Sequence, residues 1–154
     1  MVMFKILVPY NFTANDRKAL DFICELFVDR SDAFVALYHV YQPVPDLPIG
    51  KDTIMDKMRS NINYLTQRIQ DQEVELRKVC LGLVGKGFSE NRVTSLFEPK
   101  RKDVAVEIIE KAQSGNFRMV VLNRKAGRVA RFFSAPVHAK VAAGISDKTV
   151  CIVT

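Results

Sequence analysis

Short apolar runs alternate with longer stretches of helical periodicity along this chain, and no other feature limits its fold so strongly. The apolar runs cover residues 4–8, 33–41, 92–97, 119–122 and 148–153. Between them, apolar residues recur every three or four positions. This predicts a first helix that starts at Thr13 and Asp16, has its apolar stripe from Ala19 to Phe27 and ends by residues 29–32, and further helices over 52–83, 103–112 and 135–143. Regular alternation of strands and helices predicts a parallel sheet with helices on both faces.

The polarity of the runs predicts the order of the strands. The run at 92–97 is the most polar and suits a sheet edge, whereas the runs at 4–8 and 119–122 are apolar throughout and suit the centre. With right-handed crossovers, this favours a doubly wound five-stranded parallel sheet in the order 3-2-1-4-5. The 154 residues suit one domain spanning 1–154. The stretch 52–83 is long enough that a kink or break is left open.

The last run, Lys148–Val153, is apolar almost throughout, yet this order places it at the other edge of the sheet. An exposed apolar edge invites pairing with another chain. We therefore expect a homodimer formed through the C-terminal strand, the alternative being an edge covered by other parts of the same chain.

Composition limits the compartment and the partners. Lys and Arg number 23 against 17 Asp and Glu, a net charge of +6 that is spread along the chain and makes a nucleic-acid partner unlikely. Cys24, Cys80 and Cys151 are far apart in apolar surroundings, so we expect buried, reduced thiols. The apolar N-terminus is too short for a signal peptide or a membrane span. We expect a cytoplasmic protein.

Open parallel sheets bind ligands at the carboxyl ends of their strands, where the strand order reverses. Here that point lies between the first and fourth strands. The candidate ligand-binding residues are those at or near the ends of strands one, two and four: Pro9, Asn11, Val40, Asn123, Arg124, Gly127, Arg128 and Ser134.

Several segments resemble the universal stress protein family. The opening Ile6–Thr13 is similar to the family's first strand and turn, with Asn11 where an aspartate usually stands, and Leu37–Val40 is similar to its "L-x-H-V" strand end. The Pro-containing loop, the long second helix and the two late apolar strands match as well. The resemblance implies a stress-response or signalling protein that acts by binding, not an enzyme.

The loop after the fourth strand departs from the family's ATP-binding motif, G-x-x-G, nine residues, then G-[ST]. Counted from residue 123, the matching positions hold no glycine and no hydroxyl: Asn123, Ala126, Pro136 and Val137. Because those glycines let backbone N–H groups approach phosphates, the resemblance is closer to the branch that does not bind ATP. We expect a protein partner and no cofactor.

Basic side chains in the same loop support an alternative. Arg124, Lys125, Arg128 and Arg131 could bind phosphate in place of glycine backbone, with Ser134 supplying the hydroxyl. The alternative function is ATP or AMP binding at an Arg-based site, and a weaker one is another anion on this basic face, which Lys100–Lys102 would share.

Catalytic and metal chemistry find no support in the sequence. His39 lies in an apolar strand without a nearby carboxylate, so we expect a packed strand-end histidine. Two distant histidines and three apolar cysteines make no metal cluster. Thr13, three residues before Asp16, predicts a capping box for the first helix, and Asp103 predicts a cap for the third.

Overall fold

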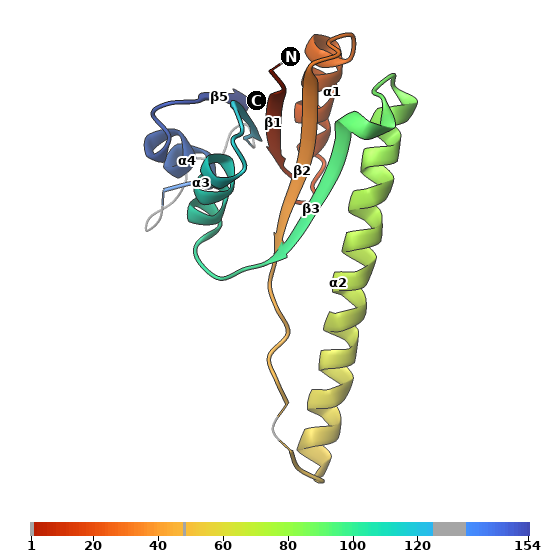
Figure 1. The fold of residues 1–154 in the computed structure, drawn as a ribbon. Coiled ribbons are helices and arrows are strands. Elements are labelled where there is room, and N and C mark those ends of the chain that lie inside the picture. Colours follow the sequence, from red (N-terminus) through yellow and green to blue (C-terminus); the bar gives the residue numbers. More distant parts are fainter. Residues whose placement is uncertain (1, 48, 125–134) are drawn as a thin grey trace.

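The computed structural model describes residues 2–47, 49–124 and 135–154, and it has the predicted alternation (Figure 1). The strands are β1 (Phe4–Pro9), β2 (Ala33–Tyr41), β3 (Val93–Pro99), β4 (Met119–Asn123) and β5 (Thr149–Val153). The helices are α1 (Asp16–Phe27), α2 (Thr53–Gly85), α3 (Val104–Ser114) and α4 (Val137–Gly144), with a short 3-10 turn at Glu90–Arg92.

The five strands form one parallel sheet in the order β3-β2-β1-β4-β5, which confirms the predicted topology. The central strand β1 is buried on both faces because its alternating side chains point to opposite layers. Ile6 and Val8 pack under α1 and α2, and Leu7 packs under α3 and α4. Helices therefore cover both faces, as the apolar runs predict.

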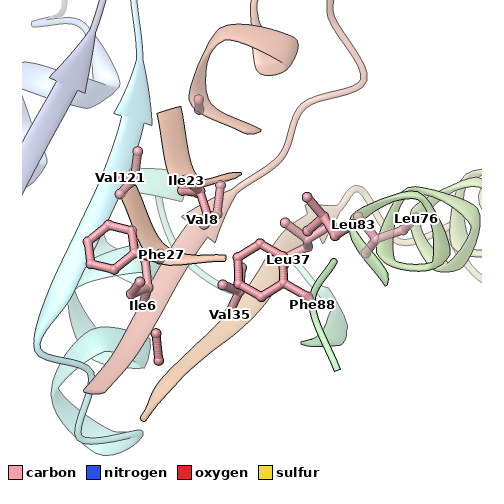
Figure 2. Close-up of a cluster of buried hydrophobic side chains, with 12 residues drawn as sticks. Ile6, Val8, Ile23, Phe27, Val35, Leu37, Leu76, Leu83, Phe88 and Val121 are labelled. Atoms are coloured by element: carbon pink, nitrogen blue, oxygen red, sulfur yellow. The ribbon is translucent and has the colours of Figure 1, made fainter. Parts of the chain in front are cut away.

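The core on the α1 and α2 side has two parts (Figure 2). Ile23 and Phe27 of α1 lie against Ile6, Val8 and Val121 of the central strands. Leu76, Leu83 and Phe88 lie against the β2 residues Val35 and Leu37. The carboxyl-terminal part of α2 is thus fixed to the sheet. On the opposite face, the buried cluster joins α3 and α4 to Leu7, Ala36, Tyr38, Val120 and Leu122.

Helix α2 is one continuous helix of 33 residues, so the kink left open by its length is absent. Its only glycines, Gly82 and Gly85, lie in the last turns, and it contains no proline, so nothing interrupts its hydrogen bonds. At 1.5 Å per residue it is about 50 Å long. Its amino-terminal half and the extended segment before it project well beyond the sheet (Figure 1).

Candidate functional site: the crevice between β1 and β4

The strand order reverses between β1 and β4, so the crevice expected to bind a ligand lies at the carboxyl ends of these two strands. Pro9 ends β1 and is buried, and Asn123 ends β4 and is half-buried. The two strands pair in parallel, with Ile6 opposite Met119 and Leu7 opposite Val120. The structure therefore brings the carboxyl ends of β1 and β4 to the same edge of the sheet.

A buried carboxylate, that of Asp16, joins these two loops. Only 1% of this residue is exposed. Its Oδ2 accepts hydrogen bonds from the backbone N–H of Thr13 (2.7 Å) and of Asn11 (3.1 Å). Its Oδ1 accepts one from Asn123 Nδ2 (2.7 Å). The carboxylate thus takes up backbone donors of the β1 loop and the side-chain donor at the end of β4.

The sequence analysis did not identify Asp16 as a site residue, although a signal for it exists. Asp16 is on the same helical stripe as Ala19, Ile23 and Phe27, all of which are buried. An acidic residue on a buried stripe needs hydrogen-bond donors around it. The backbone N–H groups of the preceding loop and an amide from a distant strand supply them here.

The predicted caps of α1 and α3 are each formed only in part. The residue at the cap of α1 is Asn15, not Thr13, and its side chain makes no capping bond. One bond of the predicted capping box is present, from the backbone N–H of Thr13 to the Asp16 carboxylate. Asp103 does precede α3, but its side chain caps nothing. Glu107 accepts the backbone N–H groups of Arg101 (2.8 Å) and Lys102 (2.9 Å), which lowers the pKa of Glu107.

The β1 loop also carries a conformational strain and an aromatic cluster. Phe12 has φ of 58°, a left-handed backbone that non-glycine residues rarely adopt. Its ring makes edge-to-face contacts with Tyr10 (5.0 Å between centroids) and His39 (4.7 Å). His39 stacks in turn on Phe97, which stacks on Tyr41. The packing of Phe12 into this cluster compensates for its unfavourable backbone.

His39 is a packed strand-end histidine, as expected. Its Nδ1 lies 2.7 Å from the carbonyl oxygen of Tyr10, so this nitrogen carries the proton and donates. Burial lowers the pKa of His39, opposed by its bond to Tyr10 and the nearby Asp16. The histidine therefore fixes the β1 loop to the end of β2 in its neutral form.

The remaining predicted site residues lie in different environments. The side chain of Asn11 is exposed, and only its backbone N–H enters the Asp16 network. Arg124 is exposed, and its backbone N–H donates to Val153 O (2.8 Å). Val40 is half-buried at the end of β2. Gly127, Arg128 and Ser134, with Lys125 and Arg131, lie outside the described residues.

The three cysteines are free thiols but only half-buried, less than their apolar surroundings predict. Burial still raises the pKa of each, that of Cys80 to about 11, so their reactive thiolate forms are suppressed at neutral pH. Among the residues that the structure describes, no three His, Cys, Asp or Glu side chains come together as a metal site. Nor does any helix of these residues have the length and apolarity needed to cross a membrane.

A second hollow, which we call the groove, lies between α2 and the segment that follows β2. Its volume is about 750 Å³. It is lined by two β2 residues, four residues of the following segment and four of α2: His39, Val40, Gln42, Pro43, Val44, Pro45, Leu65, Arg68, Ile69 and Gln72. The groove thus begins at the aromatic cluster and runs along α2.

Known structures share this fold, while no protein-family model and no curated protein sequence matches the chain. The hypothetical protein MJ0577 matches with a TM-score of 0.70 and 17% identity, over 99% of this chain and 96% of its own. The universal stress protein UspA from Lactobacillus plantarum matches with a TM-score of 0.64 and 13% identity, over 100% and 99%.

A third match is the universal stress protein from Archaeoglobus fulgidus in complex with dAMP. It has a TM-score of 0.57 and 15% identity, over 100% of both chains. The chain therefore has the α/β fold of universal stress proteins along its whole length. Identities this low establish the fold alone.

Proposed function

We propose that this chain is a member of the universal stress protein family that acts in stress response or signalling by binding, without ATP and without catalysis. The observation that carries the proposal is the Asp16 carboxylate, which is buried and bonded to donors of both crevice loops.

A phosphate at this crevice needs free donors and a positive or neutral surround. Asp16 instead adds a negative charge to the crevice and occupies its donors. Its negative charge repels a polyanion, and it already holds the N–H groups of Asn11 and Thr13 and the amide of Asn123. Freeing these donors would leave a buried carboxylate unpaired, at a cost of several kcal/mol. The ligand-free loop is the stable arrangement.

The start of α4 also favours this proposal. The positions that match the family's G-[ST] are Pro136 and Val137, which here form the cap and first residue of α4. Proline has no N–H to offer, and valine has no hydroxyl. Neither can replace the contacts that a glycine and a serine or threonine would give to a phosphate.

The absence of catalysis belongs to the same proposal. A general base must be free to reach a substrate, whereas His39 is held by Tyr10 and two phenylalanine rings. Protein recognition is then the role that fits the fold. We further propose a cytoplasmic location and a homodimer formed through β5, whose outer edge has no neighbouring strand within the described residues.

The test is calorimetric titration of the purified protein with ATP, at low and at moderate salt, together with analysis of the protein for co-purified nucleotide. We expect no heat of binding at millimolar ATP and no bound nucleotide. Saturable one-to-one binding that weakens in Arg124→Ala would overturn the proposal. The matched control is Arg118→Ala, an exposed arginine at the opposite ends of the strands.

The second candidate is an adenine-nucleotide binder that holds phosphates with Arg124, Arg128 and Ser134. The observation that favours it is the dAMP bound by the Archaeoglobus fulgidus protein of the same fold. Binding by arginine side chains would weaken steeply with salt, so the two salt conditions separate this candidate from adenine recognition by apolar contacts.

A further inference from the structure

The amino-terminal half of α2 has an apolar seam that the chain itself covers only in part. Apolar residues recur at alternating spacings of three and four: Met55, Met58, Ile62, Leu65 and Ile69, leading to Leu76, Val79 and Leu83. This is a heptad pattern. Leu76 and Leu83 are buried against the sheet, but none of the residues between 53 and 75 is buried. We call residues 42–47, 49–52 and 53–70 the arm.

Large apolar side chains gather on the surface of the arm. Ile49, Ile54, Met58 and Tyr64 are all exposed, Ile49 completely. Most of the stability of a helix in a protein comes from tertiary packing of its apolar face, and apolar side chains that gather on an exposed surface mark an interaction surface. The projection of the arm beyond the sheet (Figure 1) makes this surface accessible from several sides.

The groove opens directly onto this seam. Leu65 and Ile69 line it from α2, and Val44 lines it from the extended segment of the arm. Arg68 and Gln72 flank the apolar residues. A groove with an apolar floor and polar flanks fits one face of an amphipathic helix.

The charges along α2 identify which helix fits. Between residues 57 and 70 the charged residues are Lys57, Arg59 and Arg68, all basic. Between residues 71 and 76 they are Asp71, Glu73 and Glu75, all acidic. A positive block is followed by a negative block of equal size. Two copies of α2 laid antiparallel bring Arg59 of each copy to the acidic block of the other, whereas a parallel pair in register places like charges together.

We propose that the arm is a self-association surface on which the α2 helix of a second copy packs antiparallel along the groove. The apolar register also pairs opposite charges. If Leu65 opposes the partner's Ile69, then Ile62 opposes the partner's Gln72, and Arg59 comes beside the partner's Glu73. The twofold axis passes near residue 67. The groove of each copy receives Ile62 and Leu65 of the other.

Charge reversal and restoration test this surface. We would measure molecular mass by sedimentation equilibrium over a range of protein concentrations for wild type, Arg59→Glu, Glu73→Arg and the double variant. Each single reversal weakens self-association by about tenfold, because it turns two symmetry-related attractions into repulsions. The double variant regains the wild-type mass. Both side chains are exposed, at 49% and 42%, so the fold tolerates the changes.

The matched control is Lys78→Glu, an exposed residue of α2 beyond the paired stretch, which leaves association unchanged. A monomeric wild type would overturn the proposal and leave the groove to a different partner. If both single variants self-associated as strongly as wild type, the proposal would be overturned, and the interface would instead be the edge strand β5. A double variant as weak as the singles would also overturn it, since the two residues would not then face one another.

Cross-linking gives an independent measurement. Thr66 is exposed and lies beside the proposed axis, whereas Ser60 is exposed on the opposite face of α2. A short bismaleimide joins two chains of Thr66→Cys and does not join two chains of Ser60→Cys or of wild type. Equal cross-linking of the two variants would contradict the antiparallel arrangement.

Discussion

The Asp16 carboxylate determines which groups of the crevice are free to bind a ligand, because it is a negative charge of the protein itself that already holds the nearby hydrogen-bond donors. A carboxylate that accepts four hydrogen bonds, two of them from backbone N–H groups, is well stabilised despite its burial. The same contacts fix the β1 loop in the conformation that gives Phe12 its positive φ. Loop shape and loop charge therefore depend on one side chain.

Replacing this carboxylate by an amide should destabilise the protein. In Asp16→Asn, one of the two side-chain oxygens becomes an NH₂ group that faces other donors, so at least one buried hydrogen bond is lost. We expect the free energy of unfolding to fall by about 2–3 kcal/mol, measured by urea denaturation at fixed protein concentration.

The matched control for this variant is Asp21→Asn on the same helix. The Asp21 side chain is 55% exposed and forms surface ion pairs with Arg17 and Lys86, so its replacement should cost less than about 1 kcal/mol. Equal stability of the two variants would show that the Asp16 network contributes little.

At the scale of elements, Arg92 connects three of them at the amino ends of the strands. Its guanidinium is buried and donates to the carbonyl oxygens of Arg30 (2.7 Å) and Val28 (2.9 Å), which follow α1. It also bonds Ser89 Oγ (3.2 Å) and lies over the ring of Phe88. The turn between α1 and β2 is thereby attached to the start of β3.

Arg92→Met keeps much of the side-chain volume and removes every donor. The carbonyl group of Val28 would lose its buried partner and that of Arg30 would keep only the N–H of Ala33, so we expect a loss of roughly 3 kcal/mol in the free energy of unfolding. Arg77→Met, an exposed arginine whose partner is Glu73, should cost about 0.5 kcal/mol. If the free energies of unfolding of the two variants, measured by urea denaturation, differed by less than about 1 kcal/mol, the prediction would be wrong.

Most of the fold follows from the sequence because it depends on apolar periodicity, which is local and repeated. The polar run at 92–97 and the apolar runs at 4–8 and 119–122 correctly separate edge from centre. The crevice network does not follow in the same way. The bond from Asn123 to Asp16 spans 107 residues, and the donor from Asn11 is a backbone group that carries no mark in the sequence.

At the scale of the whole molecule, β5 offers a second surface. Thr149 N–H donates to Arg118 O, and Val153 O accepts from Arg124 N–H. In a parallel ladder, bonding groups alternate along the strand. Val150 and Ile152 therefore direct their N–H and C=O groups to the open edge. These are the groups that another strand would pair with.

Ile152→Pro tests pairing through this edge, because proline removes an outward N–H and leaves the bonds to β4 in place. We expect the variant to lose one step of association in sedimentation equilibrium, whereas the control Ile152→Val does not. Combined with Arg59→Glu, it should yield a monomer. A wild-type mass for Ile152→Pro would eliminate β5 as an interface.

Because α2 is continuous, the arm can set the distance between the two copies of a dimer. Helix α2 has no kink. It packs on its own sheet at Leu76 and Leu83 and, in the proposed antiparallel pair, on the α2 helix of a second copy near residue 67, so it fixes the distance between the crevices of the two copies. Removing one heptad from the arm would bring them closer by about 10 Å per helix while preserving the seam. Spacing, more than affinity, would then decide which pair of sites on a partner this protein can bridge.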